Sequence, residues 1–114
     1  MHVPNSIAII KRVVAIYFDI KVAQIDSRKR TADAVLPRHL AIFLANKLTN
    51  NSLNMIARHF AGRDRSTIKN AIRRMTERIA REPDLRNLTE KLESRAAQCL
   101  EEERMMMLKR VEHL

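Results

Sequence analysis

The chain is poor in the residues that disulfides, tight loops and aromatic binding surfaces need. Its 114 residues include one glycine, one cysteine, three phenylalanines, one tyrosine and no tryptophan. The lone Cys99 excludes an intramolecular disulfide and is typical of a reducing compartment. A single glycine excludes the Gly-x-x-x-x-Gly-Lys-Ser/Thr loop that cradles nucleotide phosphates, so we expect no nucleotide partner. So few aromatic rings argue against a protein that stacks single-stranded bases.

Long apolar runs are also missing. The stretches at 7–10 and 13–17 are far too short to span a bilayer, and the N-terminus lacks a signal-peptide pattern. We therefore expect a cytoplasmic protein with no membrane partner.

The sequence lacks the constellations that catalysis and metal binding require. His2, His39, His59 and His113 have no metal-ligand spacing, and no cysteine pair accompanies them. Ser66 and Thr67 stand beside no candidate base. We expect no enzymatic activity, no cofactor and no metal.

Acidic residues are scarce in the first two thirds of the chain. The net charge is +9, and residues 1–75 hold 14 of the 22 Lys/Arg but only 4 of the 13 Asp/Glu. This uneven distribution indicates an anionic partner for residues 1–75.

Apolar residues recur at helical spacing throughout, and no strand pattern is present, so we predict an all-α fold. A first helix begins at Asn5 or Ser6, with Ile7, Ile10, Val14 and Phe18 on its buried face and Lys11 off that face. Residues 22–25 fit one helical turn. Pro37 is placed in the first turn of the next helix.

The only glycine separates two amphipathic segments, as in a helix-turn-helix. Ser52 is expected to cap a helix that Gly62 ends, and Asp64 to cap a second helix over 65–80. In that second helix Ile68, Ala71, Ile72, Met75 and Ile79 share one face. Ser66, Lys69, Asn70 and Arg73 share the opposite face. A helix with such a polar, basic face suits the DNA major groove.

Residues 27–31 form a short basic run without apolar residues. Two readings remain open: a solvated loop, or a basic arm that lies along phosphates or enters a minor groove.

The break at Glu82-Pro83 divides the chain into a domain at 1–82 and a C-terminal helix or extension at 83–114. The final helix is expected from Asp84 or Leu85. Its apolar stripe, from Leu85 to Cys99, could pack back on the domain, and its outer half could pair with a second copy or a protein partner. Met105–Met107 suits an adaptable surface or a frayed helix end.

Three blocks of residues resemble the C-terminal DNA-binding domain of DnaA, the bacterial chromosomal replication initiator. They are Ser27-Arg28-Lys29-Arg30, then Pro37–Ala41 leading into Leu48-Thr49-Asn50, then Ser52-Leu53 through Ile56 with Gly62-Arg63-Asp64, Ser66-Thr67 and 71–75. The resemblance covers about 7–92. It implies a compact helical domain that reads a short double-stranded element, the DnaA box, and we expect a stand-alone copy without the ATPase module.

The resemblance also implies roles for individual residues. Arg30 matches the arginine that enters the minor groove, and Leu53 and Asn54 match positions that approach bases. The major-groove positions are Asp64, Arg65, Ser66, Thr67 and Asn70. Arg28 and Arg38 match residues near phosphates; Arg63, Lys69 and Arg73 are expected to join them.

The chain departs from the family pattern at base-reading positions. The family has a near-fixed histidine at the position of Arg65, usually proline at Asn54 and often histidine at Asn70. Arginine can bind guanine O6 and N7 together, so the preferred DNA sequence is expected to differ from the usual box.

The sequence leaves three functions open. The first is sequence-specific binding of duplex DNA by a nucleoid-associated protein in replication initiation control or transcription regulation. The second is a protein-interaction adaptor that uses the C-terminal helix and binds DNA non-specifically. The third is non-specific coating of the nucleoid.

Overall fold

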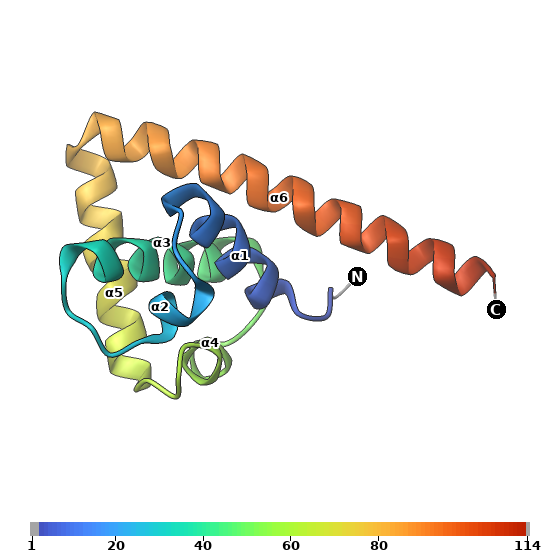
Figure 1. Cartoon of the computed structure of the whole chain (residues 1–114), viewed down its shortest axis with the longest axis horizontal. Coiled ribbons are helices and arrows are strands. Elements are labelled where there is room, and N and C mark those ends of the chain that lie inside the picture. The colour runs from blue at the N-terminus through green and yellow to red at the C-terminus, as the bar shows by residue number, and fades with distance from the viewer. Residues whose placement is uncertain (1–2, 114) are drawn as a thin grey trace.

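A computed structural model describes residues 3–113, and within them the chain is all-α, as predicted. Five of its six helices surround the sixth, α3, which crosses the middle of the molecule (Figure 1). Their bounds are α1 Ser6–Phe18, α2 Val22–Asp26, α3 Ala32–Leu48, α4 Leu53–His59, α5 Arg65–Arg81 and α6 Pro83–Glu112. No helix of this described part is long and apolar enough to cross a membrane.

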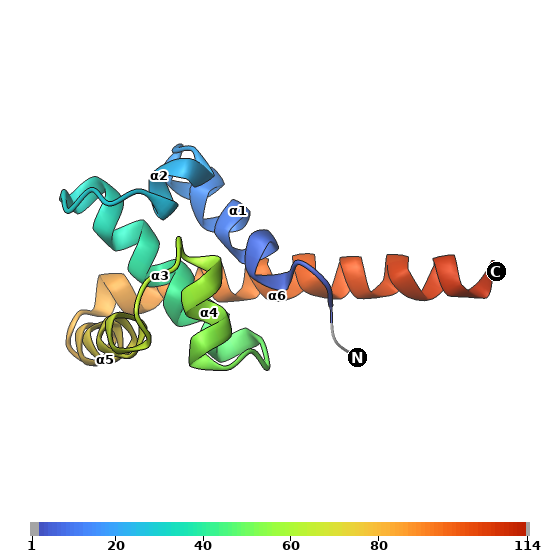
Figure 2. The ribbon, with the colours of Figure 1, turned by 90° about the horizontal axis from the view of Figure 1, so that it is seen from below.

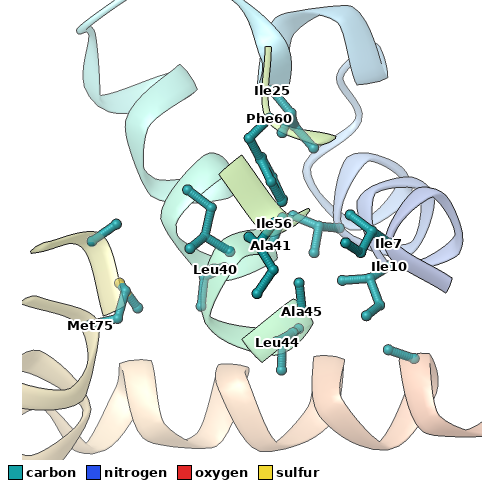
Figure 3. Close-up of a cluster of buried hydrophobic side chains, with 14 of the residues drawn as sticks. Ile7, Ile10, Ile25, Leu40, Ala41, Leu44, Ala45, Ile56, Phe60 and Met75 are labelled. Carbon is teal, nitrogen blue, oxygen red and sulfur yellow. The ribbon is translucent and has the colours of Figure 1, made fainter. Parts of the chain in front are cut away.

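The core forms where α1, α3, α4 and α5 present their apolar faces to one another. Ile10, Leu40, Leu44, Ile56 and Phe60 are fully buried there (Figure 3). Burying a side chain of this size contributes about 1.5–3 kcal/mol to folding. Packing against this core therefore sets the positions of the shorter helices, which would be marginal alone.

Lys11 is buried, which corrects the expectation that it lies off the buried face of α1. Its ammonium group donates to Asp26 Oδ1 at 2.8 Å and to the carbonyl of His59, and it lies 4.5 Å from the centre of the Phe60 ring. The charge is tolerated because a carboxylate, the C-terminal end of α4 and an aromatic face all stabilise it. Lys11 thereby joins α1, α2 and α4.

Helix α3 begins at Ala32, five residues before Pro37, so the placement of Pro37 in a first turn was wrong. The first turn is closed by Thr31, whose carbonyl accepts from the amides of Ala34 and Val35 at 3.0 and 2.9 Å. Proline inside a helix forfeits one backbone hydrogen bond. Here the ring is fully buried, and that burial offsets part of the loss.

Helix α6 has an inner half within the core and an outer half that projects from the body (Figures 1 and 2). Leu85, Leu92 and Ala96 are buried, so the stripe packs back on the domain as predicted. Pro83 begins the helix, with Glu82 as its N-cap residue. The junction at 82–83 is thus a change of helix direction, and the core continues beyond it.

Candidate nucleic-acid interface

Helices α4 and α5 form the predicted helix-turn-helix (Figure 1). The Ser52 hydroxyl accepts from the amide of Met55 at 3.2 Å, which confirms the predicted cap. The turn needs two left-handed residues, Ala61 with φ 60° and Gly62 with φ 64°. Glycine adopts this conformation without strain, whereas alanine pays for it with roughly 1–2 kcal/mol. The sequence predicted only the glycine.

Asp64 occupies the N-cap position of α5, but its side chain makes no capping hydrogen bond, contrary to expectation. Its carboxylate is exposed and lies beside the positive end of the helix dipole. The carboxylate is therefore available to a donor outside the chain.

The two faces of α5 separate as predicted. Ile68, Ala71 and Met75 are buried against the core. On the opposite face of the helix, which begins at its first turn, only Asn70 is half-buried. The exposed residues of this face are Arg65, Ser66, Thr67, Lys69 and Arg73.

Asn70 and Arg73 are paired on that face. Arg73 Nη2 donates to Asn70 Oδ1 at 2.6 Å, and Arg73 Nη1 donates to Glu77 Oε1 at 3.2 Å. The Asn70 oxygen is thus occupied while its amide nitrogen remains a donor. Reading adenine with both amide atoms would require Arg73 to release it.

Two arginines hold the basic run at 27–31, Arg38 from α3 and Arg63 from the turn of the helix-turn-helix. Arg38 Nη2 donates to the Ser27 carbonyl at 2.7 Å and to the Lys29 carbonyl at 3.0 Å, while its Nε donates to the Ile25 carbonyl at 2.8 Å. Arg63 donates to the same Ser27 carbonyl and, at 2.8 Å, to that of Phe60. We call Arg38, Arg63 and the Ser27 carbonyl the arginine clamp. It holds the basic loop in one place.

Arg38 is only 6% exposed, which corrects the expectation of a surface residue that reaches phosphate. Arg63 is half-buried and bonded within the chain. Burial lowers the pKa of both guanidinium groups. The positive charge of Arg28 lowers both further, and the charge of Arg38 also lowers the pKa of Arg63. The sequence showed two arginines but not their burial, because burial depends on how α2, α3 and the turn meet.

The clamp does not bury the other arginines of the basic loop. Arg28 and Arg30 are exposed, and Arg28 Nη2 also donates to the Ala61 carbonyl at 3.2 Å. On α4, Asn54 is exposed and Leu53 half-buried. Arg28 and Arg30 thus line a cleft beside the helix-turn-helix, whereas Leu53 and Asn54 belong to its first helix.

A basic cleft of about 750 Å³ lies between the loop and α5. Two of its lining residues, Arg74 and His39, were not predicted as site residues. Arg74 is exposed four residues beyond Asn70, so helical spacing could have identified it. His39 is half-buried, and burial lowers its pKa, with further lowering by Arg38, Arg74, Arg63 and Arg78. The cleft concentrates positive charge that an anion would neutralise.

Comparison with known proteins agrees with this geometry. Residues 7–75 match the family described as the bacterial dnaA protein helix-turn-helix. Chromosomal replication initiator protein DnaA of Methylacidiphilum infernorum is 37% identical over 87 residues, and that of Latilactobacillus sakei is 38% identical over 82 residues. These alignments cover 76% and 72% of this chain but only 19% and 18% of the relatives.

Comparison with solved structures also gives a match to a replication protein. The crystal structure of a DNA replication initiation factor matches 84% of this chain and 29% of its own, with a TM-score of 0.77 and 32% identity. The shared fold therefore extends beyond the helix-turn-helix.

Proposed function

Because the chain belongs to the family of bacterial DnaA helix-turn-helix domains, we propose that it binds double-stranded DNA at a preferred, DnaA-box-like sequence. The observation that carries the proposal is the exposed polar face of α5 beside a basic loop that the arginine clamp holds in place. In this proposal α5 enters the major groove and Arg30 enters the adjacent minor groove.

Base reading falls to exposed residues at the start of α5 and α4. Arg65, Ser66, Thr67 and Asn70 face the major groove with Asp64, and Leu53 and Asn54 approach from α4. Arg65 carries the most discrimination, since one bidentate contact to guanine contributes about 1–3 kcal/mol.

Backbone contacts come from exposed cations around the cleft. Arg28, Lys69 and Arg73 remain assigned to phosphate, and Arg74 joins them because it lines the cleft, as Arg28 does. Arg38 and Arg63 act through the loop that they position. The DNA affinity should fall steeply with salt, with a slope of about −0.9 for each phosphate neutralised.

Selection of bound duplexes from a random pool tests the proposal and supplies the preferred site. Arg65→Ala should then reduce the preference for this site over a scrambled one about 5- to 150-fold. Arg81→Ala is the matched control, because Arg81 is exposed on the last turn of the same helix. No enrichment in the pool, or equal preference in Arg65→Ala and wild type, would contradict sequence-specific reading.

The biological role proposed for this binding is control of replication initiation or of transcription at box-like sites. The adaptor alternative predicts that Arg65→Ala weakens binding to all sequences alike. Exposed apolar residues on α6, among them Met105 and Met106, favour some additional protein contact.

A further inference from the structure

Helices α1 and α6 enclose a largely apolar groove of about 570 Å³, on elements that contribute nothing to the proposed DNA interface. We call it the α1–α6 groove. Ile16, Tyr17 and Met106 line it and are 73%, 50% and 53% exposed. Large apolar side chains with this much contact to water, gathered along one groove, mark an interaction surface.

The groove carries opposite charges at different positions along α6. Lys91 and Arg95 lie on the inner part, with Arg12 on α1, whereas Glu102 and Glu103 lie on the outer part. Within residues 3–113, none of these three cations pairs with a carboxylate. A helix that fills the groove should therefore bring acidic residues to its inner part.

The outer half of α6 has the properties of such a helix. Residues 101–112 begin with three glutamates and expose Met105, Met106 and Val111. At 1.5 Å per residue they span about 18 Å, close to the length of about 20 Å for the 13 residues of α1. This half projects beyond the body of the molecule (Figure 2). A helix of about twelve residues with so little tertiary packing is marginal in water.

We propose that a second copy of this chain occupies the groove, so that two molecules exchange the outer halves of their α6 helices. A two-fold axis places each acidic 101–103 segment against the other copy's Arg12, Lys91 and Arg95 and lays Met105 and Met106 into its groove. Both ends of this contact occur in one chain, so the surface is self-complementary. Each copy keeps its helix-turn-helix open, and the dimer presents two DNA-binding faces.

Sedimentation equilibrium of the full chain tests the dimer directly. The wild-type mass should rise from 13.3 kDa toward twice that value as concentration increases. Lys91→Glu/Arg95→Glu makes the groove acidic, and Glu102→Lys/Glu103→Lys makes the outer helix basic. Each variant alone should self-associate about tenfold or more weakly, because like charges then face each other.

An equimolar mixture of the two variants should associate as strongly as wild type, since each basic helix again meets an acidic groove and each acidic helix a basic one. Glu90→Lys, an exposed change on α6 outside the groove, is the control and should leave association unchanged. Circular dichroism verifies that every variant is folded.

Three results would overturn the proposal. A wild-type mass that stays at 13.3 kDa up to millimolar concentration would leave the groove to another kind of partner. Variants that dimerise normally would place the dimer contact elsewhere. A mixture as weak as either variant alone would refute the exchange of outer helices.

Discussion

Replacing Arg38 by lysine separates a phosphate contact from a positioning role, because lysine keeps the charge but lacks the planar fork of donors. Three carbonyls accept from Arg38, and their surroundings decide the effect. The Ser27 carbonyl keeps its bond from Arg63, and Lys29 is exposed, so water can replace the arginine there. The Ile25 carbonyl lies in a buried contact and would lose its donor.

An orphaned buried carbonyl costs about 1–3 kcal/mol. We therefore expect Arg38→Lys to lower the free energy of unfolding by about 2 kcal/mol, a fall in Tm of roughly 6–12 °C for a chain of this size. DNA affinity should also fall about tenfold, because the clamp no longer aims the loop that carries Arg28 and Arg30. Differential scanning calorimetry and fluorescence anisotropy with a labelled duplex measure the two effects.

The matched control is Arg58→Lys, which makes the same exchange at an exposed site on α4. It should change the melting temperature by less than about 2 °C, as surface substitutions usually do. If Arg38→Lys behaved like this control in both assays, Arg38 would serve only as a charge and the positioning argument would be refuted.

Three further perturbations test other parts of the structure. Lys11→Met should lower the free energy of unfolding in urea by about 2 kcal/mol, because it leaves Asp26 unpaired. The double variant Lys11→Met/Asp26→Asn should recover part of this loss, and an unchanged stability in the single variant would refute the linking role of Lys11. His39→Gln should flatten the pH dependence of Tm. Because the pKa of His39 is lowered in the folded state, its contribution to stability is full above about pH 6.5 and is lost as the pH falls through the folded-state pKa. A wild-type Tm that stays constant from about pH 7.5 to 5.5 would contradict this. Gly62→Ala should lower the free energy of unfolding in urea by only about 1 kcal/mol, because nothing lies within 4 Å of an added Cβ and only the left-handed backbone is strained. A loss above about 3 kcal/mol would indicate a steric clash and contradict this reasoning.

Much of the helical framework could be predicted because its signals are local. The period of apolar residues in α5 identified both its buried and its exposed face, and Ser52 marked the start of α4. The start of α3 could not be predicted from Pro37, because the tolerance of a helix for proline depends on how the ring is buried.

Two features of the candidate site were also predictable. Exposure of the start of α5 follows from the same period, and the basic run was visible as a block of charge. The sequence left open whether that block is a free loop. Hydrogen bonds between residues 27, 38 and 63 settle its position, and no rule of spacing links residues so far apart.

The sequence by itself determined most of the helical framework, the buried and exposed faces of α5 and the concentration of positive charge in residues 1–75, because each follows from residue type and near-neighbour spacing. Only the tertiary structure decided that Lys11 and Arg38 are buried, that Arg63 shares a carbonyl with Arg38, and that α1 and α6 enclose a groove. A charged side chain enters the interior only where the fold brings carbonyls or a carboxylate to it, and those partners come from distant parts of the chain.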